Sequence, residues 1–401
     1  MIDVSSAKQR LNKSLPRPVP VRVPLKDAFD HVLSKDIRSG NFAPLFDQSA
    51  VDGYVLVNGP FKGDISCEVV GEIKAGDAPP ARVRKPSVYR IYTGAPVPKE
   101  AWSVVMQEKV TASSGMIHIP ASNLQEGSNI RRKGNHFGKG ELLLKKGTRL
   151  SAASIGLLAA TGISEVDVYR KPSIGIIVTG SELVSPGEKL LPGKIYESNS
   201  FALRAALLEA GFEVSFVGRA VDRRSALDRS LARAMKSSDV ILLTGGISVG
   251  KYDLVHDALK DAGVREIFYK VAQKPGKPLF AGKKEGQLFF GLPGNPAAVL
   301  VCFHQYVLPS LRSVSGRSEK AVGGLRLPIS DDYEVRGDRD LFLRAKINDG
   351  AVEILSGQDS DNLLSFAHAD ALVYLSKERR SYRRGDPVDV VRLGGSDNYI
   401  S

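Results

Sequence analysis

The chain has 401 residues, of which 42% are hydrophobic and 25% charged, and it carries a formal net charge of +12. This length exceeds what a single hydrophobic core usually supports, so we expect two to four domains. The composition is that of a globular protein and excludes long disordered stretches, and no run approaches the roughly 20 apolar residues of a membrane-spanning helix.

The positive charge and the cysteines limit the partners and the compartment. A net charge of +12 favours anionic partners, although a solubilising surface explains it equally well. The densest basic group lies between Arg379 and Arg384, where a solvated edge strand accounts for it as well as a ligand does. Cys67 and Cys302 show neither metal-ligand spacing nor a disulfide framework. Because the N-terminus also lacks a signal-peptide-like apolar run, we predict a cytoplasmic protein.

The first 170 residues predict helices at the start and a β-rich segment after them. Residues 3–13 have helical spacing, and the prolines that follow favour an extended connection. Pro24 near a first turn predicts a second short helix over residues 24–33. Between residues 41 and 140, short β-rich runs alternate with Gly, Pro, Asn and Asp clusters, which is typical of an all-β segment. Two further elements are expected, a helix over residues 152–160 and a strand over residues 165–169.

From residue 171 onward, strands alternate with helices. We expect strands at residues 173–178, 213–217, 239–243, 266–271 and 287–290, and helices at residues 200–210, 225–235, 253–261 and 297–311. This alternation indicates a doubly wound parallel sheet, in which ligands bind at the carboxyl ends of the strands. From about residue 317 the chain returns to short strands without clear helices, which predicts a small β domain.

Two loops directly after buried strands have compositions suited to ions. In TGGISVG, residues 244–250, glycines let successive backbone N–H groups face an anion, and the next helix adds positive charge. Asp253 follows in the first turn of that helix, where it either caps the helix or takes part in the site. In TGSE, residues 179–182, Glu182 either holds a metal or closes the loop with a salt bridge.

Two proline-rich loops, KPGKP at residues 274–278 and GLPGNP at residues 291–296, are stiff because proline fixes φ. The two lysines of KPGKP suit a small tetrahedral oxyanion held in one geometry, or else they are solvated. For Asp52 and Thr93 in the β-rich segment the alternative is a plain turn, and a solvated loop explains the basic run 131–133 better than a binding site does. The residues alone therefore indicate an anion-binding α/β domain with extra β domains, and they leave metal dependence open.

Taken together, these segments resemble one family. DQSAVDGYVL, IYTGAPVP, VVMQE, NIRRKG, GIIVTGSELV, ESNSFAL, LLTGGISVGKYD, KPGKP and GLPGNPAAV occur in the order found in MoeA-type molybdopterin molybdenumtransferases, which include the E domain of gephyrin. The resemblance runs from about residue 5 to about residue 395. A looser relative, the single-domain molybdopterin-binding module, shares only residues 171–315.

The resemblance implies an α/β plus β fold with four domains. These would be a linking domain at residues 1–40 and 141–170, a β-rich insertion domain at 41–140, a doubly wound molybdopterin-binding α/β domain at 171–316 and a C-terminal small β domain at 317–401. It also implies a homodimer, whose site lies between the α/β domain of one subunit and the β insertion of the other. Contacts with other proteins of the cofactor pathway are a further expectation, whereas nucleic acid and membrane are not expected as partners.

The family's reaction is the insertion of molybdate into adenylylated molybdopterin with release of AMP, and it depends on Mg²⁺ or another divalent cation. By motif, the resemblance assigns catalytic roles to Asp52, Glu182, Asp222, Asp253, Lys270 and Lys274. Of these, Glu182, Asp222 and Asp253 would hold the cation. Binding of the substrates is assigned to Thr93, Arg131, Gly245, Gly246, Ser248, Gly250, Lys277, Pro278, Pro293, Gly294, Asn295, Pro296, Arg344 and Ser360.

Two departures from the family pattern keep alternatives open. His136 stands where the family usually has an acidic residue, and Ala298 stands where a serine is frequent. They motivate a second hypothesis, a non-catalytic pterin-binding or scaffolding protein. A third, a nucleic-acid binder, rests only on the charge and predicts salt-dependent DNA binding. Because the main acidic and basic positions persist, we expect an active enzyme.

Overall fold

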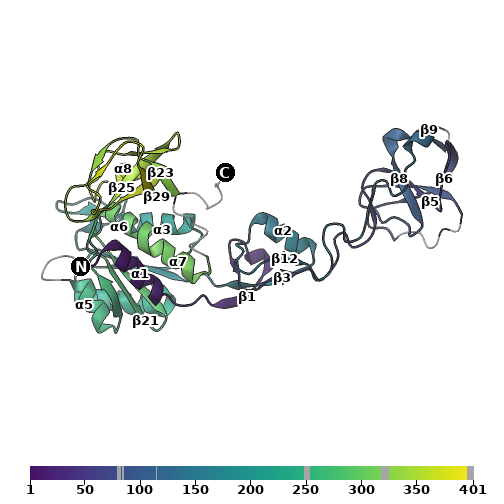
Figure 1. Cartoon of the computed structure of the whole chain (residues 1–401). Coiled ribbons are helices and arrows are strands. Elements are labelled where there is room, and N and C mark those ends of the chain that lie inside the picture. The colour runs from purple at the N-terminus through teal and green to yellow at the C-terminus, as the bar shows by residue number, and fades with distance from the viewer. Residues whose placement is uncertain (79–82, 84, 114, 248–252, 318–324, 395–401) are drawn as a thin grey trace. The chain divides into compact units, whose positions relative to one another are not determined.

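The computed structural model describes residues 1–78, 83, 85–113, 115–247, 253–317 and 325–394. It divides into two compact units (Figure 1). The larger unit comprises Met1–Ser34, Gly147–Ser151 and Glu165–Ser401, and the smaller unit comprises Lys35–Lys146 and Ala152–Ser164. No helix in the described ranges has both the length and the apolar character needed to cross a membrane. The four domain boundaries expected from the sequence stay a prediction.

A six-stranded sheet forms the centre of the larger unit. In spatial order its strands are β17 (Val214–Ala220), β14 (Ile174–Thr179), β18 (Val240–Thr244), β22 (Gln287–Leu292), β21 (Phe280–Lys284) and β19 (Arg265–Tyr269). The first four are parallel, whereas β21 runs antiparallel to β22 and β19. The expectation of a parallel sheet is therefore wrong at β21. No strand is expected there from the sequence, because Gly282 and two lysines shorten the apolar run.

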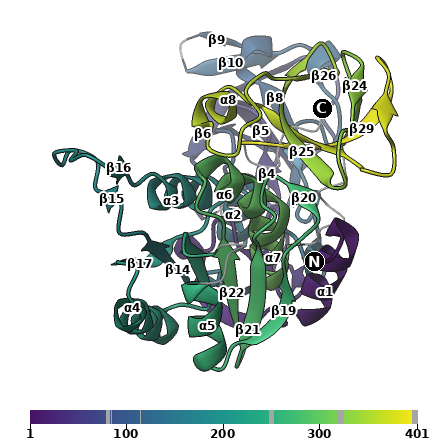
Figure 2. The same cartoon turned by 90° about the vertical axis from the view of Figure 1, so that its left-hand side faces the viewer.

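Helices cover both faces of this sheet, as a doubly wound fold requires (Figure 2). One face packs against α1 (Val4–Ser14), α3 (Asn199–Glu209), α6 (Pro296–Cys302) and α7 (Leu308–Val314). The opposite face packs against α4 (Arg224–Ser237) and α5 (Leu254–Asp261). Alternate residues of β14 enter the two cores, Ile176 on the first face and Ile177 on the second. This double burial explains why β14 and β18 are continuous apolar runs.

The N-terminal part of the larger unit forms a small sheet of β1 (Pro20–Pro24), β13 (Glu165–Tyr169) and β2 (Val32–Leu33). The helix expected over residues 24–33 is wrong, since only a 3₁₀ turn, Leu25–Asp27, forms there. Pro24 is extended because it ends β1, which pairs with β13 along its whole length. This pairing joins segments about 140 residues apart, so local propensity does not reveal it.

A second sheet of the larger unit lies toward the C-terminus. Its strands are β20 (Gln273–Lys274), β25 (Asp340–Asn348), β27 (Ala371–Leu375), β29 (Pro387–Arg392) and β23 (Leu325–Pro328), with β26 (Ala351–Ile354) paired to β25. Two short pairs join β24 (Tyr333–Glu334) to β28 (Ser381–Tyr382) and β15 (Leu183–Val184) to β16 (Ile195–Tyr196). One short helix, α8 (Leu363–Ala367), forms where no clear helix was expected. In the basic group, Arg379 pairs with the nearby Asp386, and Arg383 pairs with Asp332 on a distant segment, so both arginines form structural ion pairs.

The smaller unit is built mainly of strands, as the sequence predicts. Its six-stranded sheet has the order β8 (Ala101–Met106), β5 (Gly53–Val57), β7 (Ser87–Ile91), β6 (Ile65–Ile73), β10 (Met116–Ile119) and β9 (Thr111–Ser113). Two short pairs join β4 (Gln48–Ser49) to β11 (Ile130–Arg131) and β3 (Ile37–Arg38) to β12 (Leu142–Leu144). The helix α2 (Ala152–Ala160) has the predicted bounds.

Candidate functional site

The carboxyl ends of four parallel strands bring the predicted loops to one edge of the central sheet. Asp222 follows β17 and Glu182 follows β14. Their loops are joined at Ser181, whose N–H donates to Asp222 Oδ2 at 2.8 Å and whose hydroxyl accepts from the Asp222 N–H at 3.1 Å. Both Asp222 and Glu182 are exposed, so their carboxylates are open to a ligand.

The glycines after β18 are required by close packing. Gly245 and Gly246 have φ values of 78° and 63°, in the left-handed region that favours glycine. A Cβ atom on Gly245 would lie 2.3 Å from the Thr179 carbonyl oxygen, and one on Gly246 would lie 2.8 Å from Thr179 Oγ1. The TGG loop therefore packs in direct contact with Thr179 of the TGSE loop. Ser248 and Gly250, which were also predicted to bind substrate, lie outside the described residues.

Asn199, in the first turn of α3, links two of these loops. Its Nδ2 donates to the Gly294 carbonyl oxygen at 2.8 Å and lies 3.4 Å from Thr244 Oγ1. Its Oδ1 is buried and has no hydrogen-bond partner among the described residues. Asn199 is not among the predicted site residues, although an asparagine immediately before the expected helix at residues 200–210 is a usable signal.

Asp253 caps α5, which is one of the two roles expected of it. Its Oδ1 accepts from the His256 N–H at 3.0 Å, and its Oδ2 accepts from the Tyr269 hydroxyl. Burial and then the hydrogen bond to Asp253 raise the pKa of Tyr269, so the phenol stays a donor. Each carboxylate oxygen keeps a further lone pair, and capping therefore does not exclude a second role.

The KPGKP loop packs against buried residues and leaves Lys274 exposed to solvent. Lys274 is exposed, whereas Pro275 and Gly276 are buried. A Cβ on Gly276, at φ 90°, would lie 2.5 Å from Cys302 Sγ. Gln273 Nε2 donates to the Pro275 carbonyl oxygen at 3.0 Å and closes the loop from below. Burial raises the pKa of the Cys302 thiol, so the thiol that packs against this loop is neutral.

The C-terminal sheet contacts both proline-rich loops. β20, which contains Lys274, pairs with the start of β25. Asn295 Nδ2 donates to Ser360 Oγ at 2.5 Å, and the Ala298 N–H donates to the Ser360 carbonyl oxygen at 3.1 Å. The structure thus brings together Asn295 and Ser360, two residues that were expected to bind substrate.

Arg344 is fully buried on β25 and organises the loop that carries Ser360. Its NH2 donates to the Gly357 and Asp359 carbonyl oxygens at 2.7 and 3.0 Å, and its Nε donates to Ser365 Oγ at 2.9 Å. Its NH1 is buried without a partner in the described part of the chain. Burial lowers the pKa of this guanidinium. An orphaned donor on a buried cation is a position where an oxyanion would be favourable.

Lys270 follows β19 in a left-handed conformation, with φ 63°. Its N–H donates to the Leu279 carbonyl oxygen at 2.9 Å, and its carbonyl oxygen accepts from the Ile2 N–H at 3.0 Å. Its Nζ lies 4.7 Å from the centroid of the Tyr269 ring. These contacts place the ammonium next to the acid–phenol pair of Asp253 and Tyr269. Lys277 and Pro278 are half-buried, and Pro293 and Pro296 flank the Gly294–Asn295 turn.

In the smaller unit, the structure brings Asp52 and Thr93 together. The Thr93 N–H and hydroxyl donate to Asp52 Oδ1 at 2.8 and 2.7 Å. These two bonds lower the pKa of Asp52, which is therefore ionised at neutral pH. Arg131 is exposed on β11, and His136 is exposed after it, with its N–H donating to the Ala43 carbonyl oxygen at 2.8 Å.

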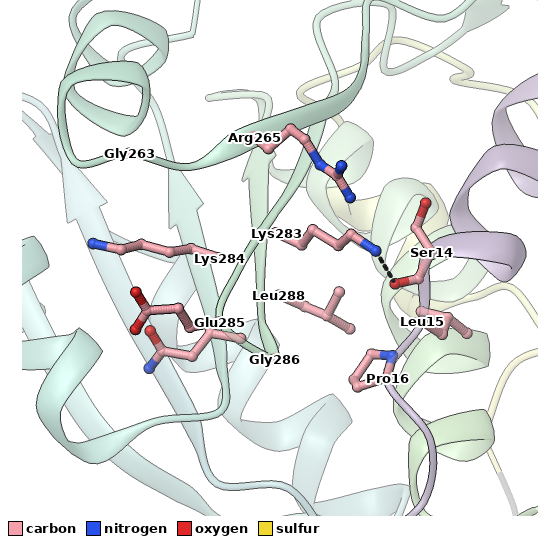
Figure 3. Close-up of a pocket in the computed structure, with 11 residues that line it drawn as sticks. Ser14, Leu15, Pro16, Gly263, Arg265, Lys283, Lys284, Glu285, Gly286 and Leu288 are labelled. Atoms are coloured by element: carbon pink, nitrogen blue, oxygen red, sulfur yellow. Dashed lines mark hydrogen bonds between the residues drawn. The ribbon is translucent and has the colours of Figure 1, made fainter.

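A cleft of about 440 Å³ lies at the opposite edge of the central sheet (Figure 3). Lys283 Nζ donates there to the Ser14 carbonyl oxygen at 3.2 Å, and Lys284 Nζ donates to the Ala262 carbonyl oxygen at 2.9 Å. Each lysine thus satisfies a carbonyl at the C-terminal end of a helix, where a cation is favourable. The cleft contains none of the predicted site residues, and capping explains these two lysines.

Three family models match consecutive parts of the chain. They describe the MoeA N-terminal region (domains I and II) at residues 2–162, a probable molybdopterin binding domain at residues 175–313, and the MoeA C-terminal region (domain IV) at residues 326–393. A molybdopterin molybdenumtransferase of Haemophilus influenzae is 32% identical, and the match covers 97% of this chain and 98% of that protein. The chain belongs to the MoeA family of molybdopterin molybdenumtransferases.

Further members agree with this assignment. A molybdopterin molybdenumtransferase of Nostoc is 33% identical over 92% of this chain and 88% of that protein. The crystal structure of a molybdopterin biosynthesis MoeA protein from Pyrococcus horikoshii is 30% identical, with a TM-score of 0.81 over 99% of this chain and 100% of that one. The family resemblance and the α/β plus β fold class expected from the sequence are confirmed.

Proposed function

We propose that this chain inserts molybdate into adenylylated molybdopterin and releases AMP, as a divalent-cation-dependent transferase. The observation that carries the proposal is the junction of the TGSE, TGG, GLPGNP and KPGKP loops with the Ser360 loop in the larger unit. This junction offers backbone donors, two lysines and exposed carboxylates around one edge of a sheet. Those groups suit a substrate that carries phosphates and an oxyanion.

The acidic residues fit a cation that the substrate helps to hold. Among the described residues, no three His, Cys, Asp or Glu side chains are grouped closely enough to bind a metal by themselves. Mg²⁺ commonly takes only one or two carboxylates and completes its shell with water and phosphate oxygens. Glu182, Asp222 and Asp253 supply such hard oxygen ligands on neighbouring loops. A cation bound there would neutralise the charge that develops on the pyrophosphate.

The basic residues would hold the anions in one geometry. Lys270 and Lys274 project from loops that are fixed by backbone hydrogen bonds and strand pairing. The amides of Gly245 and Gly246 would receive phosphate oxygens of the substrate. Molybdate would lie near Ser360 and the unpartnered NH1 of Arg344, with Lys274 and Lys277 at the entrance. Asp52, Thr93 and Arg131 of the smaller unit are proposed to serve the same reaction.

The outer face of α3 supports the proposed homodimer. Phe201 and Leu208 lie seven residues apart on this helix and are 59% and 70% exposed. Leu191 and Ile195, on the neighbouring segment, are 54% and 56% exposed. Exposed apolar side chains grouped in this way are normally covered, and a second copy of the chain would cover them. A cytoplasmic location and contacts with other cofactor-pathway proteins remain proposals of the same kind.

Both departures from the family pattern are consistent with an active enzyme. Ala298 is 2% exposed, so a serine at this position would face the protein interior. His136 is exposed and its N–H donates to the distant Ala43 carbonyl oxygen, and the Asp52–Thr93 pair forms without it. These two positions remain the reason to consider a non-catalytic protein. Measuring AMP release decides between that alternative and the transferase.

The test is AMP release from adenylylated molybdopterin by the purified full chain, with Mg²⁺, in the presence and absence of molybdate. We expect release that molybdate stimulates and that chelation of Mg²⁺ abolishes. A folded protein that binds the pterin but releases no AMP would instead support the binding or scaffolding function. DNA retardation at low salt would revive the nucleic-acid hypothesis.

A further inference from the structure

Tyr269, the last residue of β19, touches two of the proposed catalytic residues with different parts of its side chain. Its hydroxyl donates a hydrogen bond to Asp253 Oδ2. Its ring lies beneath Lys270, whose Nζ is 4.7 Å from the ring centroid. Asp253 and Lys270 come from separate loops. The Tyr269 side chain therefore contacts both the Asp253 carboxylate and the Lys270 ammonium and positions them relative to each other.

The ring of Tyr269 is itself held from other sides. The His256 ring stacks on it at a centroid distance of 4.7 Å and an interplanar angle of 17°. Phe280 packs against it at 6.4 Å. His256 is in turn held by its Nε2, which lies 3.1 Å from Glu266 Oε2. The position of the phenol is therefore set by α5, β19 and β21 together.

The Asp253 carboxylate has a single orientation because both its oxygens are engaged. The helix cap fixes Oδ1 at 3.0 Å from the His256 nitrogen, and the Tyr269 hydroxyl fixes Oδ2. Without the phenol, the cap alone would leave the carboxylate free to turn about its own axis. Partners that orient a ligating carboxylate in this way commonly change metal affinity by 10- to 100-fold when they are removed.

We propose that Tyr269 is a positioning residue for the transfer reaction. Its hydroxyl orients Asp253 for the divalent cation, and its ring face holds the ammonium of Lys270 through a cation–π contact. The inference rests on the proposed function for the roles of Asp253 and Lys270. The two contacts are chemically separable. Tyr269→Phe removes only the hydroxyl, whereas Tyr269→Leu removes both the hydroxyl and the aromatic face.

The experiment compares both variants with the wild-type chain in two assays. The first is the Mg²⁺ dependence of AMP release, and the second is Mn²⁺ binding in the presence of AMP, followed by electron paramagnetic resonance. For Tyr269→Phe we expect about a tenfold weaker apparent affinity for Mg²⁺ and for Mn²⁺. The KM for the adenylylated substrate at saturating Mg²⁺ should stay near the wild-type value. For Tyr269→Leu we expect the same loss together with about a threefold rise in that KM.

Two further variants make the result interpretable. Asp253→Asn should weaken Mn²⁺ binding at least as much as Tyr269→Phe does. Tyr333→Phe, on β24 of the C-terminal sheet, should leave both assays unchanged. Wild-type Mn²⁺ affinity in Tyr269→Phe, or in Asp253→Asn, would overturn the inference. If the wild-type chain releases no AMP, the proposed function fails, and the Mn²⁺ titration still decides the role of Tyr269. Should Tyr269→Leu not fold, Tyr269→Phe alone carries the test.

Discussion

The side-chain amide of Asn295 donates a hydrogen bond to the Ser360 hydroxyl at 2.5 Å and so joins the GLPGNP loop to the C-terminal sheet. The Ala298 N–H donates to the Ser360 carbonyl oxygen at 3.1 Å, so two hydrogen bonds hold Ser360 at this junction. Arg344 holds the Ser360 loop from its buried side through the Gly357 and Asp359 carbonyl oxygens. Ser360 is therefore fixed to the GLPGNP loop and the start of α6, and Arg344 of β25 holds the residues beside it.

Ser360→Ala should weaken the use of molybdate without unfolding the protein. The substitution removes the acceptor for Asn295 and keeps the backbone bond from Ala298. A neutral hydrogen bond contributes about 0.5–1.5 kcal/mol, so the molybdate concentration at half-maximal AMP release should rise about three- to tenfold. Ser356→Ala, at an exposed position of the same loop, is the matched control. Equal molybdate dependence in the two variants would place Ser360 outside the substrate pocket.

Lys274→Ala should also raise the molybdate concentration needed for insertion while the fold stays intact. Lys274 is exposed, and its loop is closed by Gln273 and Gly276, which the substitution leaves in place. Removing one charge that meets an oxyanion should cost about tenfold or more in apparent affinity. Lys346→Ala, an exposed lysine on β25, controls for the change in net charge. Unchanged molybdate dependence would mean that Lys274 is a surface residue.

The features that the sequence predicts correctly are those that short segments encode. β14 and β18 read as continuous apolar runs because both of their faces are buried. Once the alternation of strands and helices is recognised, the carboxyl ends of the strands must meet at one edge, which places TGSE and TGG together. The motifs then name individual residues, of which Asp52 with Thr93 and Asn295 with Ser360 are in contact.

The features that the sequence does not predict depend on contacts between distant segments. Pro24 is extended because of β13, and no local signal reports that partner. The hydrogen bond from Tyr269 to Asp253 and the link from Asn199 to Gly294 both cross between elements of the folded domain. A tyrosine at the end of a strand is a common core residue, so its sequence position alone gives no reason to single it out.

Gly245→Ala should disable the site through a steric clash. The added methyl would lie 2.3 Å from the Thr179 carbonyl oxygen, at a φ that already disfavours a side chain. We expect AMP release to fall at least a hundredfold, with a stability loss of about 2 kcal/mol. Gly286→Ala separates the two causes, because Gly286 has φ 87° but nothing within 4 Å of the added atom. If both variants retain activity, the TGG loop does not need its close approach to Thr179.

The ion pair of Asp239 with Arg170 predicts a loss of stability in acid. Burial alone would raise the pKa of Asp239, but the Arg170 guanidinium and the Ser173 hydroxyl and N–H outweigh it and lower the pKa to about 2. A carboxyl whose pKa is lowered by folding stabilises the protein above its unfolded pKa, and that contribution disappears as the pH falls from about 4 toward 2.

Asp239→Asn should therefore lower the apparent Tm at pH 7, and its difference from wild type should shrink below pH 4. Asp239 is a third exposed, so we expect only about 1–2 kcal/mol. Asp389→Asn is the matched control, since Asp389 and Arg326 form a pair that is 51% and 68% exposed and should contribute little. Thermal unfolding of the three proteins at pH 7 and pH 3 measures the effect. A pH-independent difference would show that the charge of Asp239 is not its source.

Leu208→Asp should dissociate the proposed dimer. Leu208 is 70% exposed on α3, and the same face carries Phe201 at 59% exposure. A charge placed at the centre of an apolar interface would be desolvated without a partner, which costs several kcal/mol on each side of a twofold axis. Light scattering should then report a monomer with the secondary structure of the wild type. Leu364→Asp, equally exposed at 70% but on α8, should leave the oligomeric state unchanged. A dimer that survives Leu208→Asp and dissociates with Leu364→Asp would move the interface from α3 to the C-terminal part of the larger unit.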